Sequence, residues 1–431
     1  MTRTVILGGG ALGLTLAYRL ARAGDEVIVL ERESVPGGLA SGFELTPGIW
    51  LDRFYHHLFA SDRHAIALIG ELGLEADLRW SRPATVTLRD GRLHQLDSAT
   101  SLLRFSPLPM AARLRMGVAL AYLRALPSAD RLEGQRAADW IRRRMGSAAY
   151  DTVWGPLLRG KFGARAEEIA LPWFWARVHD RTARLGYLRG GFRTMYERLA
   201  ERITANAGRI ELGREVRSVQ TTPAGGLRVT HAAAGDAAAE SLHADRVVST
   251  LAVALTCRLV PELPGAYRDR HASGTAYGAH CLVLALDRPL TSAYWVNVND
   301  PGYPFMALVE HTNYVPPTEY GGRHLVYLGN YRPMDDPLLR MPTPEVVAQF
   351  APHLARINPA FSSDWITDAW SFAAPFAQPI VTVDYRERIP PFETPVPGLW
   401  LASMFQVYPH DRGQNYSIDL ANRLAARMRS R

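Results

Sequence analysis

The chain contains 431 residues, of which 47% are hydrophobic and 21% are charged, and this balance is that of an ordinary globular protein. A chain of this length exceeds what one hydrophobic core usually supports, so we expect two domains. The net charge of +7 comes almost entirely from arginine, because Lys161 is the only lysine. Without a basic stripe interleaved with aromatic residues we expect no nucleic-acid partner, whereas scattered arginines suit an anionic substrate or an anionic membrane surface.

The cysteines and the apolar runs exclude disulfide-rich, metal-binding and membrane-spanning classes of protein. Cys257 and Cys281 lack metal-like spacing, so we expect neither a disulfide framework nor a metal site. No run of 18 or more uncharged apolar residues predicts a membrane span, and the first predicted strand begins at residue 4, which leaves no room for a signal peptide. We therefore expect a cytoplasmic protein.

The N-terminal segment has the order strand, glycine-rich turn, helix, strand. In such a unit Gly8 permits the turn, Gly10 lets the backbone approach a pyrophosphate, and Gly13 lets the helix and strand pack closely. The helix N-terminus presents free N–H groups. The second strand, Glu26–Leu30, ends in Glu31, whose carboxylate can accept hydrogen bonds from ribose hydroxyls. The segment therefore predicts dinucleotide binding.

A glycine pair follows the acid in the pattern E-R-x-x-x-x-G-G-L-A. This pattern resembles the flavoprotein superfamily of amine oxidases, protoporphyrinogen oxidases, phytoene desaturases and UDP-galactopyranose mutases. The resemblance implies FAD and assigns Arg32, Gly37, Gly38 and Leu39 to it, with the glycine pair along the diphosphate and isoalloxazine edge. Because no cysteine or histidine lies in a covalent attachment motif, we expect the FAD to be bound non-covalently. Amine oxidases usually have arginine after the pair, so Leu39 indicates the protoporphyrinogen oxidase and mutase branches.

The resemblance also implies the fold, an α/β protein with a Rossmann-type FAD-binding domain and a discontinuous α+β substrate domain of antiparallel sheet and helices. Leu188–Leu199 resembles the G-G-x-x-x-L signature at which the chain returns to the FAD-binding domain. We assign residues 1–80, 188–255 and 385–431 to the FAD-binding domain, and residues 81–187 and 256–384 to the substrate-binding domain.

Two histidines and the lysine are the candidate catalytic residues. His56 and His57 lie in an aromatic segment that resembles the part running past the flavin ring, where histidine can hydrogen-bond the flavin or transfer a proton. The alternative is one solvated and one buried structural histidine. Lys161 is proposed to lie at the flavin or at a substrate anion, because an amine, unlike guanidinium, loses its proton when buried. Its retention by chance is the alternative.

The middle of the chain supplies candidate substrate contacts. Arg159, Arg177 and Arg181 lie among aromatic residues, either as the wall of an anionic ligand site or in a packed helical core. Tyr408 is a further substrate candidate. The apolar helix predicted over Pro107–Leu126, interrupted by arginines, either roofs the substrate cavity or touches a bilayer.

The C-terminal segment is predicted to form a strand, a loop and an amphipathic helix. The resemblance implies that this helix start covers the flavin, with the backbone at Gly413, Asn415 and Tyr416 directed at its pyrimidine edge. The usual Gly-Asp after the strand is Ser-Met here, so Asp411 is the candidate replacement for the carboxylate that contacts the ribityl chain.

The resemblance favours an FAD-dependent oxidoreductase that transfers hydride from a substrate C–H to flavin N5. A redox-neutral sugar-nucleotide mutase or isomerase is the alternative, and a non-catalytic flavin-binding protein is a third class. The expected partner is a small-molecule substrate, anionic or lipid-linked, with peripheral membrane contact left open. The oligomeric state, the substrate and the electron acceptor are not predicted.

Overall fold

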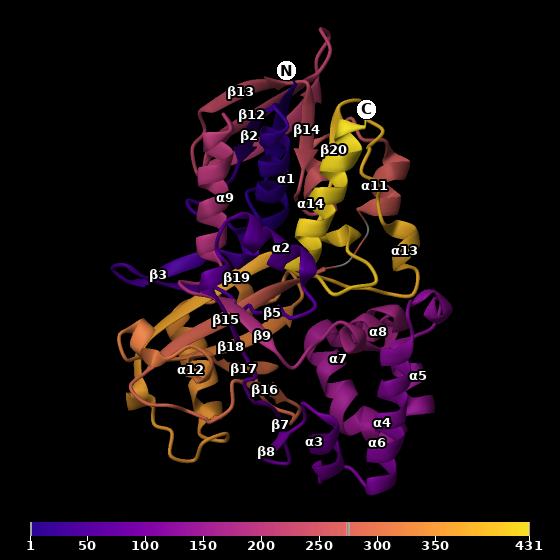
Figure 1. Cartoon of the computed structure of the whole chain (residues 1–431), viewed down its shortest axis with the longest axis vertical. Coiled ribbons are helices and arrows are strands. Elements are labelled where there is room, and N and C mark those ends of the chain that lie inside the picture. Colours follow the sequence, from indigo (N-terminus) through magenta and orange to yellow (C-terminus); the bar gives the residue numbers. More distant parts are fainter. Residues whose placement is uncertain (1, 273, 275, 431) are drawn as a thin grey trace.

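The computed structural model describes residues 2–272, 274 and 276–430. These residues form a nucleotide-binding part around a parallel sheet, and a second part made of a large sheet and a group of helices (Figure 1). This arrangement confirms the predicted α/β fold class with a separate α+β domain.

The nucleotide-binding part is built on a five-stranded sheet whose strands all pair in parallel. Its order is β10-β2-β1-β14-β20, with bounds Arg209–Glu211, Glu26–Leu30, Arg3–Leu7, Arg246–Ser249 and Leu399–Leu401. Because side chains alternate along a strand, Ile6 faces the helices while Val5 faces the opposite side. The covering helices are α1 (Ala11–Arg22), α9 (Arg193–Ala205) and α14 (Gln414–Arg429).

A small antiparallel sheet and two helices cover the other face. These elements are β11 (Arg214–Thr221), β12 (Leu227–Ala233), β13 (Ala239–Ala244), α10 (Val253–Leu259) and α11 (Gly265–His271). The predicted domain crossing at residues 255 and 256 falls inside α10, and Val253 and Cys257 of that helix are buried with the nucleotide-binding core.

The substrate part contains a seven-stranded sheet with the order β19-β15-β18-β17-β16-β7-β8. Its bounds are Ile366–Pro379, Ala276–Leu286, His324–Arg332, Ala307–Glu310, Trp295–Val298, Thr85–Arg89 and Arg92–Gln95. Neighbouring strands pair antiparallel except β16 with β7. α12 (Thr343–Leu354) packs on one face. Asp90 and Gly91, both with positive φ, form the predicted hairpin turn.

The helices of the substrate part lie beside this sheet (Figure 1). They are α3 (Ala99–Arg104), α4 (Met110–Ala125), α5 (Ala137–Arg144), α6 (Ser147–Ala149), α7 (Gly155–Phe162) and α8 (Leu171–His179). Their shared core is aromatic and includes Tyr150, Phe162, Trp173 and Phe174. Part of the aromatic segment therefore packs as a helical core, as one of the two interpretations of the sequence expected.

Short elements join the two parts. They are the hairpin β3–β4 (Gly42–Thr46 and Ile49–Asp52), the three-stranded sheet of β5 (Leu58–Phe59), β9 (Leu185–Leu188) and β6 (Leu78–Ser81), α2 (Arg63–Glu71) and α13 (Tyr385–Arg388). Within residues 2–272 and 276–430, the helices are all too short or too polar to cross a bilayer.

Candidate active site

The glycine-rich turn after β1 forms an open cradle against the glycine pair. Gly8 has φ +106°, and a Cβ on Gly13 would lie 2.0 Å from the Gly8 carbonyl oxygen, so both positions require glycine. A Cβ on Gly38 would lie 3.2 Å from the Gly10 Cα. The Gly37 amide donates to the Gly9 carbonyl at 2.8 Å. Since no side chain caps the N-terminus of α1, its first-turn N–H groups stay open to a pyrophosphate.

Glu31 lies at the end of β2 beside this turn and is buried. Its Oε2 accepts from the Gly9 amide at 2.6 Å, and its Oε1 accepts from the Glu33 amide at 2.8 Å. Two backbone donors fix the carboxylate where a ribose would reach it. Arg32 is exposed and its guanidinium contacts Glu33 at 3.2 Å.

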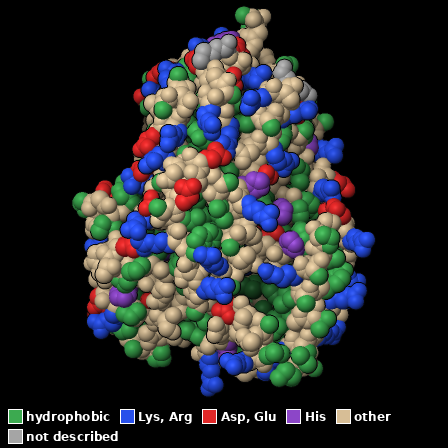
Figure 2. All heavy atoms as spheres, viewed as in Figure 1, with side chains coloured by type: hydrophobic (Ala, Val, Ile, Leu, Met, Phe, Trp, Pro, Cys, Tyr) green, Lys and Arg blue, Asp and Glu red, His purple; other side chains and the backbone are tan. Residues whose placement is uncertain are grey.

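A cavity of about 1060 Å³ lies where the nucleotide-binding part, the large sheet and the helices meet. Figure 2 shows the surface hollowed between the sheet and the helices. Ten residues predicted for the site border this cavity. They are Leu39, His56, His57, Lys161, Arg177, Arg181, Asp411, Gly413, Asn415 and Tyr416.

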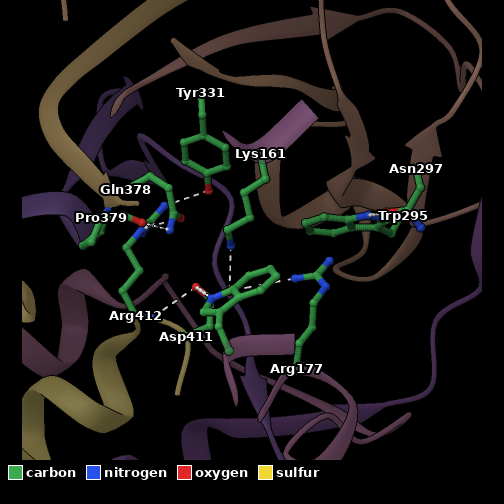
Figure 3. Close-up of polar contacts among 10 residues, drawn as sticks. Lys161, Arg177, Trp295, Asn297, Tyr331, Gln378, Pro379, Asp411 and Arg412 are labelled. Carbon is green, nitrogen blue, oxygen red and sulfur yellow. Dashed lines mark hydrogen bonds and ion pairs between the residues drawn. The ribbon is translucent and has the colours of Figure 1, made fainter. Parts of the chain in front are cut away.

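Lys161 and Asp411 form the central ion pair of the cavity (Figure 3). The Lys161 Nζ donates to the Asp411 Oδ2 at 2.6 Å, and the Trp173 indole N–H donates to the other carboxylate oxygen at 3.2 Å. Burial lowers the pKa of Lys161 from 10.5 to about 7, against the opposing charge of Asp411. Burial also disfavours the Asp411 anion, but the charges of Lys161 and Arg177 hold the pKa of that carboxyl well below its ordinary 3.8. Asp411 is therefore ionised at neutral pH.

Three arginines add positive charge around this pair. Arg177 Nη1 lies 3.8 Å from Asp411 Oδ2. Burial and the charge of Arg177 lower the pKa of Arg181 from 12.5 to about 9, which leaves Arg181 charged at neutral pH. Arg412 donates to the Tyr331 hydroxyl at 2.7 Å and to the Gln378 side chain at 3.1 Å.

Arg412 and its partners on the large sheet were not predicted from the sequence. Arg412 directly follows Asp411 in the sequence. A charged residue next to a candidate site acid was the one local feature that could have indicated its place in the site. Tyr331 and Gln378 come from β18 and β19 and reach the site through tertiary packing alone.

Both candidate histidines border the cavity as neutral imidazoles. Burial and the charge of Arg412 lower the pKa of His56 from 6.5 to about 4, and burial and the charge of Arg181 lower the pKa of His57 to about 3. The His56 Nδ1 hydrogen-bonds the Phe54 carbonyl at 2.8 Å, and the His57 Nδ1 lies 3.1 Å from the Tyr294 hydroxyl.

Arg159 and Tyr408 lie outside the cavity, so the structure does not bring them together with the other substrate candidates. Arg159 is exposed. It precedes Lys161 by two residues on α7, and this spacing places the two side chains on nearly opposite faces of a helix. The Tyr408 hydroxyl donates to Glu133 at 2.8 Å, and its ring stacks on Tyr385.

The side chains at the start of α14 hold neighbouring elements. Asn415 Oδ1 accepts from the His64 and Ala65 amides at the first turn of α2, at 2.9 and 3.2 Å. Tyr416 donates to Asp180 at 2.7 Å. No side chain caps the N-terminus of α14 at Gly413, so its first N–H groups stay available to a ligand.

The helix α4 borders the cavity with Met116, Gly117, Leu120, Ala121 and Arg124, as expected of a roof. Its outer face carries large exposed apolar side chains at four-residue spacing. They are Met110, Leu114, Val118 and Tyr122, with Leu103 of α3 beside them.

The described residues contain no cluster of three or more histidine, cysteine or acidic side chains that is able to hold a metal ion.

Comparisons with known proteins agree with this geometry. Residues 13–410 match the family model for flavin containing amine oxidoreductase. An alignment of 156 positions, which covers 32% of this chain and 27% of 15-cis-phytoene desaturase of Glycine max, is 25% identical. The match thus spans about a quarter of the relative's length.

The same fold occurs in solved structures of low sequence identity. An oxidoreductase from Methanosarcina mazei has a TM-score of 0.77 at 18% identity, covering 98% of this chain and 99% of the other. Reduced UDP-galactopyranose mutase has a TM-score of 0.74 at 14% identity, covering 99% of this chain and 96% of the other. The family model covers most of the chain, and the glycine cradle, the buried Glu31 and the open helix N-terminus fit FAD. The chain belongs to the flavin-containing amine oxidoreductase family.

Proposed function

We propose that this enzyme oxidises a C–H bond of a small molecule bound in the 1060 Å³ cavity. The observation that carries the proposal is the buried Lys161–Asp411 pair in a cavity that also exposes Leu39 of the cofactor segment and Gly413 at the start of α14. Bound FAD would supply the redox chemistry as the hydride acceptor. Gly10, Gly38 and Glu31 would hold its adenosine diphosphate end.

The residues of the chain would bind and orient the substrate and handle its proton. Lys161, whose pKa is about 7, accepts or donates a proton near neutral pH. His56 and His57 are neutral at that pH and act as hydrogen-bonding groups. Arg177 and Arg181 border the cavity and would hold an anionic group of the substrate.

The redox-neutral mutase is the competing reaction. The match to the oxidoreductase family favours oxidation, and the likeness to the mutase at 14% identity extends to the fold alone. The test adds a panel of candidate substrates anaerobically to the oxidised and to the dithionite-reduced enzyme. Oxidation predicts bleaching of the oxidised flavin band. Turnover confined to the reduced enzyme, without net electron transfer, would instead establish the mutase.

We further propose that the outer face of α3 and α4 rests on an anionic bilayer and admits an apolar or lipid-linked substrate. In Figure 2, hydrophobic side chains gather at the lower right, over these helices. Five of the seven large exposed apolar side chains of the described chain lie there. Residues 98–129 contain four arginines and no acid, so this segment carries a net positive charge that suits anionic lipid.

A further inference from the structure

The Lys161 side chain ends between two aromatic faces and a carboxylate. Its Nζ lies 5.2 Å from the ring centroid of Trp173 and 5.6 Å from that of Tyr331. Asp411 Oδ2 lies 2.6 Å from the same nitrogen. Figure 3 shows Lys161 extending from α7 between Tyr331 and Asp411. The three partners come from α8, β18 and the loop before α14, so tertiary packing assembles them.

Two aromatic faces within about 6 Å of a nitrogen, together with a carboxylate, form the arrangement that recognises organic ammonium ions. The faces supply the negative side of the ring quadrupole, and the carboxylate neutralises the charge. We refer to Trp173, Tyr331 and Asp411 as the ammonium cage. In this chain the cage is already filled, because Lys161 is buried at 8% exposure with its amine inside it.

The charges around the cage disfavour a second cation. Arg177 lies over the same Trp173 ring at 5.8 Å, and Arg412 lies over the Tyr331 ring at 5.3 Å. Arg181 also borders the cavity. A substrate ammonium would have to displace Lys161 while facing these guanidinium groups in a site of low dielectric constant, where like charges repel strongly.

We propose that Lys161 is a built-in occupant of the ammonium cage and that it excludes amines, so the cavity accepts neutral or anionic substrates. This inference rests on the proposed function, since it concerns the substrate class of the same cavity. It separates this enzyme from members of its family that oxidise amines. Lys161 thereby acts as a determinant of specificity as well as a charge at the site.

The test removes the Lys161 side chain from the cage by mutation and adds a soluble ammonium ion in its place. In FAD-loaded Lys161→Ala, the lost part of the side chain corresponds to n-propylammonium, which serves as the probe. We expect n-propylammonium chloride, compared with sodium chloride at equal concentration, to raise the Tm of Lys161→Ala and to leave that of the wild type unchanged. A ligand that binds only the folded state stabilises it by mass action.

Two matched variants locate the binding. Lys161→Met fills the same volume without charge and should not respond to the probe. The double variant Lys161→Ala, Asp411→Asn lacks the carboxylate and should bind the probe at least about tenfold more weakly than Lys161→Ala. If n-propylammonium raises the Tm of Lys161→Ala and of Lys161→Met equally, or does not raise the Tm of Lys161→Ala, the proposal that Lys161 occupies an ammonium-binding cage is wrong.

A measurement on the wild type covers the case in which Lys161→Ala does not fold. The flavin absorbance of the wild type is titrated with n-propylammonium and with 2-phenylethylammonium, which we expect to leave the spectrum unchanged. Binding of either with a Kd below about 1 mM would contradict the exclusion of amines. Neither the Tm nor the flavin titration involves turnover. These measurements therefore test the ammonium cage separately from the proposed C–H oxidation.

Discussion

The Lys161 ammonium and the Asp411 carboxylate, 2.6 Å apart, join a helix of the substrate part to the loop that leads into α14 of the nucleotide-binding part. Lys161 is buried and Asp411 is partly buried, and the Trp173 indole N–H donates to the Asp411 carboxylate. Removing one partner of a buried pair leaves the other charge uncompensated, so changes at either residue affect both the site and the junction.

The first prediction concerns FAD. Gly10→Trp places an indole in the cradle opposite Gly38, and we expect FAD occupancy to fall at least about tenfold, which corresponds to ~1.4 kcal/mol. Occupancy is measured as flavin absorbance per protein after desalting. Gly265→Trp is the control, since no heavy atom lies within 4 Å of a Cβ there. A Gly10→Trp protein with full yellow colour and unchanged Tm would contradict the dinucleotide site.

The second prediction is a pH dependence of anion binding. Because burial lowers the pKa of Lys161 to about 7, the amine is charged below pH 7 and loses its proton as the pH rises through 7. The affinity for an anionic probe such as dodecanoate should therefore fall across this range. Lys161→Met should remove the dependence, whereas Lys161→Arg should keep the affinity high, because guanidinium stays charged. The flavin spectrum reports binding, and a dependence that persists in Lys161→Met would assign it to another group.

The third prediction separates two arginines that the sequence grouped together. Arg177 borders the cavity, so Arg177→Gln should weaken dodecanoate binding by about tenfold to a hundredfold, the ~1.5–3 kcal/mol of a hydrogen bond to a charged group. Arg159→Gln should have no such effect, because Arg159 is exposed outside the cavity. Equal effects of the two changes would exclude the proposed anion site.

The fourth prediction concerns the bilayer. Val118 is 72% exposed on the outer face of α4, and Val118→Glu should weaken co-sedimentation with anionic vesicles about tenfold by replacing apolar contact with a repelled charge. Leu212→Glu changes an exposed apolar residue of the nucleotide-binding part and should have no effect. If the wild type fails to bind such vesicles at low salt, where the attraction is strongest, the face serves as a roof alone.

The nucleotide-binding part was the most predictable region of the chain. Gly8, Gly10, Gly13 and Glu31 act through local backbone geometry, and such geometry leaves a fixed spacing in the sequence. The family match confirms FAD as the cofactor, and short apolar runs in the sequence predicted the strands that hold the turn.

The sequence by itself determined the dinucleotide motif, because this motif depends on residues close together in the chain, and the chain length indicated two parts. The α/β class followed from the resemblance of its motifs to the flavoprotein superfamily. The tertiary structure decided the site. It placed Lys161 against Asp411, 250 residues away, and brought Tyr331 to Lys161. It also left Arg159 outside the cavity, because Arg159 and Lys161 are two residues apart on α7 and side chains at that spacing point to nearly opposite faces of a helix. Contacts between distant segments follow from how helices and sheets pack, and no local pattern in the sequence records them.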